Sequence, residues 1–352
     1  MILHFACPNC GAPMAYNITR GKLFCAHCDH EEPIGQDPEA WLTPDPKAEE
    51  TEAADHMAED VQGHVKKILI CPNCGGTLQT GDKTCAVHCD FCDSELVVAD
   101  RLQGDMRPSA LLPFSLDRDK AVAAFKKWCH NGLFAPSGLT SPKNIKNLRP
   151  VYVPYWLYDI TCDTDLDATA TRVSVYVNGD TEYTETSFYD VQRGMTLSYD
   201  QVPYDASEEM DDSLMAKLQP YDFKKLTDFR MPYFAGFTVD QRDYESEELL
   251  PLVKHQVEGY MADQARSTIA GYSTVRINRQ TFDYKNIVRK YVFLPIWFIS
   301  YRYLNKDYIF AMNGQTGKVI GIPPISKLKV TGWFAGIAAV IFAVLMLIGG
   351  VF

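Results

Sequence analysis

Eight cysteines, which form two copies of one motif, constrain the possible folds of this chain more than any other feature of its sequence. Each unit reads Cys-Pro-Asn-Cys-Gly, then a gap, then Cys-x-x-Cys, with 14 residues between the inner cysteines (11–24 and 75–88). The second unit repeats the first at a constant offset of 64 residues. The two sets are Cys7, Cys10, Cys25 and Cys28, and Cys71, Cys74, Cys89 and Cys92. A repeat that keeps its register predicts two small domains of one design.

The spacing of the two sets is typical of zinc ribbons. A Cys-x-x-Cys turn directs two sulfurs at one centre, and two such turns on neighbouring hairpins close a tetrahedron of thiolates. We therefore predict two structural Zn²⁺ ions, in sites with no open coordination position for catalysis. Gly11 and Gly75 allow the turns to adopt positive φ, and Asp29 and Asp93 occupy the matching places in the second pairs. A dithiol redox pair and an iron–sulfur cluster are the alternatives, and the repeated ribbon spacing favours zinc over both.

The compartment expected for the chain supports metal binding over disulfides. The N-terminal residues have neither a basic n-region nor an apolar h-region, so no export of the front of the chain is expected. In a reducing compartment, spaced cysteine pairs are read as metal ligands. Cys85 precedes the third cysteine of the second unit by four residues and could replace it, but the matched gap argues against this. Cys129 and Cys162 are expected to be core thiols, and His27 and His88 surface residues.

Five segments are expected along the 352 residues. They are ribbon 1 (1–30), an acidic flexible linker (31–66), ribbon 2 (67–100), an α+β domain (101–325) and a transmembrane helix (330–352). The linker carries eleven acidic residues and one Lys between Glu31 and Asp60, and its expected role is to space the first ribbon from the rest. A fraying helix is a second reading for Lys47 to Gln62. Short strands are expected beside the cysteine pairs, at Ile68, Ile70, Leu96 and Val98.

The α+β domain shows helix and hairpin signals. Asn178-Gly179 is expected to be the turn of a hairpin, because both residues tolerate positive φ. The expected helices run from Asp117 to about His130, from about Ser207 to before Pro220, and from about Glu245 to Ala270; the expected strands are 169–177 and 181–188.

A fainter duplication lies in the same domain. Tyr152-Val-Pro-Tyr-Trp-Leu-Tyr is similar to Phe293-Leu-Pro-Ile-Trp-Phe-Ile, and each is expected to lead into a strand that ends at Asn-Gly. Two aromatic strands that line one core explain the similarity. A docking groove lined by Trp156 and Trp297 is the alternative.

The C-terminal segment is predicted to cross a membrane. Trp333 to Phe352 is a run of 20 apolar residues, about 30 Å as a helix, which matches the hydrocarbon thickness. Lys318, Lys327 and Lys329 precede it, so the positive-inside rule places residues 1–329 in the cytosol and the protein in the cell membrane as a single-pass chain. Small residues repeat every four positions from Gly332 onwards, which favours a helix–helix contact and leaves a homo-oligomer open.

No enzymatic motif is found. The sequence lacks His-Glu-x-x-His, Gly-x-Ser-x-Gly and a Walker A loop, and 314–318 is read as a hairpin turn. The formal charge of −11 and the absence of a basic stripe with stacking aromatics argue against nucleic-acid binding. The sequence therefore predicts a non-enzyme.

Motifs along nearly the whole chain resemble a bacterial family of membrane-anchored proteins with TFIIB-type zinc ribbons, often mislabelled as primosomal-helicase-like. The motifs are Cys71-Pro-Asn-Cys-Gly, Cys89-Asp-Phe-Cys92, Leu112-Pro-Phe, Lys127-Trp128, Phe134-Ala-Pro136, Tyr152-Val-Pro-Tyr-Trp156, Tyr183-Thr-Glu-Thr-Ser187 and Phe310-Ala-Met-Asn-Gly-Gln-Thr-Gly-Lys318. The resemblance implies an association with SPFH-domain and phage-shock-type membrane-stress proteins.

Together these patterns predict a membrane-tethered cytosolic adaptor whose ribbons recruit protein partners. A membrane-associated nucleic-acid-binding factor and a thiol or zinc sensor are the alternatives. Tight, salt-sensitive nucleic-acid binding would favour the first alternative, and reversible metal loss under mild oxidant would favour the second.

Overall fold

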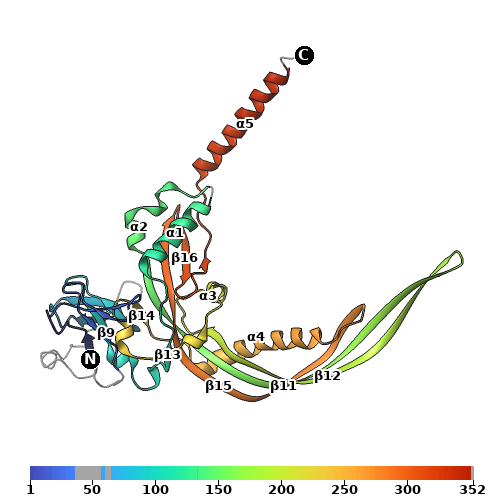
Figure 1. Ribbon diagram of the computed structural model, residues 1–352, viewed down its shortest axis with the longest axis horizontal. Helices are drawn as coiled ribbons and strands as arrows, with labels where there is room; N and C mark the ends of the chain where they lie inside the picture. Colours follow the sequence, from blue (N-terminus) through green and yellow to red (C-terminus); the bar gives the residue numbers. More distant parts are fainter. Residues whose placement is uncertain (36–56, 60–64, 133, 350–352) are drawn as a thin grey trace. The chain divides into compact units, whose positions relative to one another are not determined.

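A computed structural model describes residues 1–35, 57–59, 65–132 and 134–349 of the chain. The fold is mixed α+β, and the chain divides into two compact units (Figure 1). The base unit comprises Met1–Pro154, Glu209–Gln241 and Phe293–Phe352; the hairpin unit comprises Tyr155–Glu208 and Arg242–Val292. Residues 101–325, which the sequence suggests are one domain, contribute to both units.

Short antiparallel strands surround each set of cysteines, as predicted. In the first cysteine unit (residues 1–35), β2, β3 and β4 form a sheet, while β1 pairs with β9 of the second cysteine unit (residues 65–98). The strands are β1 (Ile2–His4), β2 (Ala15–Asn17), β3 (Lys22–Phe24), β4 (Glu31–Glu32), β5 (Met57–Glu59), β6 (Val65–Ile70), β7 (Thr77–Gly81), β8 (Thr84–His88) and β9 (Glu95–Val98).

Two of these strands lie in residues that the sequence assigned to the linker. β4 pairs with β3, and β5 pairs with β6. Residues 57–59 are therefore extended, and the fraying-helix reading is wrong for them because backbone pairing with β6 offers an alternative to helical hydrogen bonds. The remainder of the linker, 36–56 and 60–64, lies outside the described residues.

The rest of the base unit places short helices beside strands of the large sheet. The strand order is β1-β9-β8-β14-β11-β15-β10-β13, with β16 on β15 and β17 on β16. In this order β11 spans Arg149–Asn178 and β15 spans Thr274–Tyr303. The remaining elements of this unit are η1 (Ala99–Leu102), η2 (Gly104–Met106), β10 (Ala110–Leu111), α1 (Arg118–Asn131), η3 (Ser137–Thr140), α2 (Pro142–Lys146), α3 (Asp212–Leu218), η4 (Phe223–Lys225), β13 (Thr227–Asp228), η5 (Met231–Phe234), β14 (Thr238–Asp240), β16 (Lys306–Asn313), β17 (Val319–Ile320) and α5 (Lys327–Gly349).

Helix α1 confirms the sequence prediction. The Asp117 side chain accepts a hydrogen bond from Lys120 N, which satisfies a free N–H group of the first turn, and the helix ends before Gly132. Its apolar stripe is buried, and the rings of Phe125 and Trp128 contact Phe310 of β16. The third helix of the prediction is also confirmed, as α4 (Ser246–Ser267).

Helix α3 is shorter than predicted at its N-terminus. The Asp211 carboxylate accepts the N–H of Leu214 and starts the helix there. Ser207, the predicted start, donates its N–H to the Asp205 carboxylate instead.

The alternative reading of the duplication, a docking groove lined by Trp156 and Trp297, is not supported at Trp297. Trp297 is only 2% exposed, its indole N–H donates to Leu116 O at 2.9 Å, and its ring contacts Phe114. A residue enclosed in the core of the base unit cannot line a docking groove. The buried side chain at Trp297 agrees instead with the reading of a core strand.

The hairpin unit consists of three long strands and one helix. The predicted hairpin is confirmed: Asn178 pairs with Thr181 across the turn, and Gly179 has φ +65°. The strands are much longer than predicted: β11 (Arg149–Asn178), β12 (Thr181–Asp205) and β15 (Thr274–Tyr303), of which β11 and β15 begin or end in the base unit. Helix α4 packs its apolar stripe on β11 and β12, burying Leu249, Val253, Val257, Met261 and Ala265.

The second half of the fainter duplication contains a turn that the sequence did not suggest. β15 ends at Tyr303, and Leu304 and Asn305, with φ of +49° and +59°, reverse the chain into β16. β16 then ends at Asn313 as predicted, and residues 314–318 form the predicted hairpin turn to β17.

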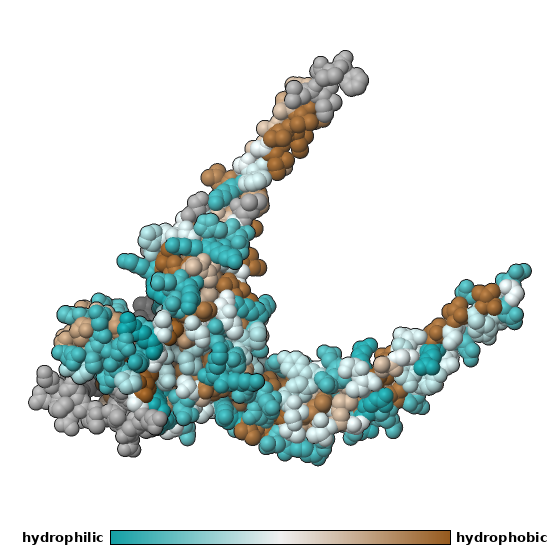
Figure 2. Space-filling model, in the orientation of Figure 1, coloured by the Kyte–Doolittle hydropathy of each residue, from teal (hydrophilic) through white to brown (hydrophobic). Residues whose placement is uncertain are grey.

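Helix α5 is the one helix of the described residues that is long and apolar enough to cross a membrane. The qualifying stretch is Lys327–Met346, with a mean hydropathy of 2.0 and none of it buried. Figure 2 shows its apolar surface uncovered.

Candidate metal centres

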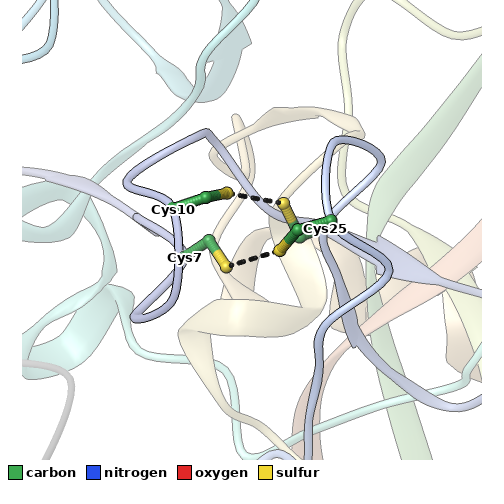
Figure 3. A group of neighbouring side chains, drawn as sticks. Cys7, Cys10 and Cys25 are labelled. Atoms are coloured by element: carbon green, nitrogen blue, oxygen red, sulfur yellow. Dashed lines mark hydrogen bonds between the residues drawn. The ribbon is translucent and has the colours of Figure 1, made fainter.

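Each set of four predicted ligands comes together in one cluster. The four sulfurs of either set lie within 4.8 Å of one another. Figure 3 shows Cys7, Cys10 and Cys25 of the first cluster, with their sulfurs facing a common centre. The closest cross-pairs are Cys7–Cys28 at 3.5 Å, Cys10–Cys25 at 3.5 Å, Cys71–Cys92 at 3.7 Å and Cys74–Cys89 at 3.8 Å.

These distances fit a tetrahedral metal site. Four sulfurs at Zn–S bonds of about 2.3 Å stand about 3.8 Å apart along each edge of the tetrahedron. Both clusters therefore have the size and donor set of a closed four-thiolate centre.

All four Cys-x-x-Cys turns share one backbone geometry. In each turn the residue after the second cysteine donates its N–H to the carbonyl of the first, at 2.8–3.0 Å, and has positive φ. These residues are Gly11, Asp29, Gly75 and Asp93, with φ of +73°, +58°, +73° and +56°. The predicted role of these four positions is confirmed. The turn directs backbone N–H groups toward the sulfurs, where they stabilise negative charge.

The thiols of each cluster have divergent pKa values. Burial disfavours the Cys92 thiolate, yet hydrogen bonds from Ser94 lower its pKa to about 6. Burial also opposes ionisation of Cys25, but backbone N–H groups of Cys28 and His27 lower its pKa to about 7. In contrast, burial and the neighbouring sulfurs raise the pKa of Cys71 to about 12. Four sulfurs this close cannot all ionise unless a cation shares the centre.

Polar neighbours support the clusters at matching positions of the repeat. Asn73 Nδ2 lies 3.5 Å from Cys92 Sγ and donates to Ser94 Oγ at 2.8 Å. In the first unit the equivalent Asn9 Nδ2 lies 3.1 Å from His30 Nδ1. This pairing was not predicted, although the Asn that both Cys-Pro-Asn-Cys motifs share is a signal for it in the sequence.

The remaining cysteines lie outside both clusters. Cys129 and Cys162 are buried, which agrees with the prediction of core thiols. Cys85 is also buried, and it does not replace Cys89 in the second cluster. His27 is exposed, as predicted. His88 is also exposed, as predicted, and its Nδ1 and Nε2 lie 3.1 Å from the carboxylates of Glu95 and Asp93, respectively.

The first cysteine unit packs against other residues of the base unit. Tyr16 N donates to Ala235 O at 2.9 Å, and its ring contacts Tyr233 and Phe237. Burial and the neighbouring Tyr233 raise the pKa of Tyr16 to about 12. The unit is therefore held by direct contacts, whereas the sequence suggested that it is spaced from the rest.

These features define the chain as a mixed α+β protein with two four-cysteine centres suited to metal and one helix suited to a membrane span. No family model matches the chain, and no solved structure matches it. An uncharacterized protein of Bacillus subtilis strain 168, YdjG, is 38% identical over 348 residues, which cover 99% of this chain and 98% of YdjG. The chain therefore belongs to the same family as YdjG.

Proposed function

We propose that the chain is a membrane-anchored adaptor that holds two structural zinc ions and recruits a protein partner on the cytosolic side. The observation that carries the adaptor role is the exposed, apolar end of the β11–β12 hairpin. The two cysteine centres and helix α5 support the zinc and membrane parts of the proposal.

Zinc is the metal that best fits the two clusters. Closed four-thiolate sites at ribbon spacing are typical of structural zinc, which stabilises units too small to fold on an apolar core. We expect elemental analysis to find two zinc ions per chain. Cys10→Ser should remove one of them, while Cys85→Ser, a cysteine outside both clusters, should leave the zinc content unchanged. Iron, or no metal, would contradict the assignment.

Helix α5 is proposed to be the membrane span, with the rest of the chain in the cytosol. Lys327 and Lys329 lie in the first turn of the helix, on the side from which the rest of the base unit extends, and the positive-inside rule places such lysines in the cytosol. The intact chain should sediment with membranes at high pH and high salt. A chain that stays in the supernatant would contradict this part of the proposal.

The end of the β11–β12 hairpin is exposed to solvent on both faces and is not packed against the rest of the hairpin unit. Every residue from Arg172 to Thr186 is exposed. One face carries Val173, Val175, Val177 and Phe188, of which Val177 is 67% and Phe188 72% exposed; the pairing register places them on the same side. On the opposite face the rings of Tyr176 and Tyr183 stack at 5.5 Å. Figure 2 shows apolar surface near this end of the hairpin.

The chemistry of the hairpin end selects a protein as its partner. Exposed apolar patches mark interaction sites, and an isolated two-stranded hairpin is marginally stable in water. Asp180, Glu182 and Glu185 surround the patch, so anionic lipid and nucleic acid are repelled from it. A protein surface that combines apolar and basic side chains would be complementary to this apolar patch and its acidic neighbours. The family resemblance points to phage-shock-type or SPFH-domain proteins as the class to test.

A capture experiment tests the recruiting role. The full chain, solubilised from membranes, should capture a purified phage-shock-type or SPFH-domain protein. The double variant Val175→Thr, Phe188→Thr removes apolar area from the patch, while Thr retains a high propensity for β-strands. It should reduce capture at least tenfold. Val288→Thr is a matched control, because Val288 is an exposed valine of β15 in the same unit.

Two outcomes of the same experiment would contradict the proposal. Equal capture by the double variant would show that the hairpin end is not the docking surface. Failure to capture any protein of either class, together with nucleic-acid binding that weakens steeply with salt, would favour a nucleic-acid factor over the adaptor.

A further inference from the structure

One segment of the base unit is basic in an otherwise acidic chain. Residues 117–149, which contain α1, η3 and α2, carry seven Lys or Arg and two Asp, a net charge of +5, whereas the whole chain carries −11. We call this stretch the basic segment.

The basic segment is connected directly to the start of α5. Ser326 N donates to Phe134 O at 2.7 Å, and Lys329 Nζ donates to Ala135 O at 2.6 Å. The ring of Trp333, in the second turn of α5, contacts the ring of Phe134. These contacts place the loop after α1 at the end of α5 where a membrane-spanning helix would enter the bilayer (Figure 1).

The basic side chains of α1 are presented to solvent. Helix α1 buries its apolar stripe, which leaves Lys126 and Lys127 exposed. The Arg118 guanidinium donates to Leu148 O and Ile145 O at the end of α2, so the two helices form one surface. Lys120, another basic residue of α1, forms an ion pair with Asp117: its Nζ lies 3.7 Å from the Asp117 carboxylate.

Apolar side chains lie next to this charge. Ile322, Ile325 and Leu328, just before and within the first turn of α5, are 80%, 60% and 84% exposed. Exposed apolar residues beside lysines are the combination that binds the boundary between headgroups and acyl chains.

We propose that the basic segment binds anionic lipid headgroups at the surface of the bilayer that α5 enters. This inference rests on the proposed membrane anchoring and adds a second, lipid-selective contact to it. Juxtamembrane lysines and arginines are attracted to an anionic leaflet over about a Debye length, so only residues held near the span contribute. Helix α1 meets that condition, because Phe134 and Ala135, which follow it closely, contact the start of α5.

Hydrogen exchange of the full chain in nanodiscs tests the inference. In discs that contain phosphatidylglycerol, amides of α1 should exchange roughly fivefold more slowly than in purely zwitterionic discs, and added salt should remove the difference. Lys126→Glu with Lys127→Glu should abolish the lipid dependence. Lys224→Glu with Lys225→Glu is the matched control, because it reverses two adjacent exposed lysines of the base unit and should preserve the effect.

The outcomes separate this inference from the proposed anchoring. Incorporation into both kinds of disc with equal exchange in α1 would overturn the inference and leave the anchoring intact. Failure of the full chain to enter discs of either kind would contradict anchoring by α5 and would overturn the inference with it, because the inference rests on that anchoring. Persistence of the lipid dependence in the Lys126→Glu, Lys127→Glu variant would also overturn the inference.

Discussion

Positive φ at four matched positions is the residue-level feature that shapes both metal centres. Gly11 and Gly75 adopt the left-handed region without strain, and Asp29 and Asp93 adopt it because short polar side chains tolerate it. At these positions the sequence alone was sufficient, since the turn geometry follows from the Cys-x-x-Cys motif and the residue after it.

Replacing Gly75 by Ala should weaken metal binding by the second cluster. No atom lies within 4 Å of the added Cβ, so the cost is the left-handed backbone, about 1 kcal/mol, or roughly a fivefold loss of zinc affinity. Competition with a chromophoric chelator measures the loss. Gly138→Ala, also in open space but without positive φ, is the control and should retain wild-type affinity.

Metal binding should release protons, with affinity falling as pH falls. Cys92 has a pKa of about 6 and is largely ionised at pH 7.5, whereas Cys71, at about 12, is protonated. Because a four-thiolate centre needs every sulfur deprotonated, roughly two or three protons should leave per ion bound at pH 7.5. Calorimetry in buffers of different ionisation enthalpy counts them. A release of less than one proton would contradict the four-thiolate assignment.

At the element level, the sequence predicted which strands and helices exist better than how long they are. The Asn178-Gly179 turn was recognised because its residue types demand it, but β11 extends 20 residues before the predicted strand start at Thr169. That extension depends on pairing with β12 and packing under α4, which involve residues distant in sequence. The Leu304–Asn305 turn was missed because Leu carries no turn signal.

Helix α4 offers a test of local propensity. Gly259 lies in its interior, is exposed, and has no atom within 4 Å of an added Cβ. Gly259→Ala should therefore stabilise the hairpin unit by about 1 kcal/mol, measured as an upward shift of its denaturation midpoint. The same substitution at Gly271, where φ is +84°, should destabilise the unit. A stabilising effect at both sites would refute the conformational explanation.

At the scale of the whole molecule, each unit is assembled from separate stretches of chain. The base unit uses three stretches and the hairpin unit two. This division could not be predicted from the sequence, because β11 and β15 are continuous strands that belong to both units. The cysteine centres could be foreseen because their ligands are close in sequence, whereas the contact of Tyr16 with Tyr233 could not.

Removing the metal should loosen one unit and spare the other. A strong chelator should speed amide exchange at least tenfold in β8 and β9, since the second cluster holds both strands. Amides of α4, whose buried face packs on β11 and β12, should keep their protection. Hydrogen exchange with mass spectrometry reports both regions in one experiment. Equal loss of protection in α4 would show that the two units unfold together.

The contacts of Phe134 with Ser326 and Trp333, and of Ala135 with Lys329, have a mechanical consequence for the base unit. A membrane-spanning helix that is joined to a folded domain by a flexible linker can tilt without moving that domain. Here α5 shares hydrogen bonds and a ring contact with the loop that follows α1. If α5 spans a bilayer, as proposed, a change in bilayer thickness that forces it to tilt would therefore turn the rest of the base unit with it.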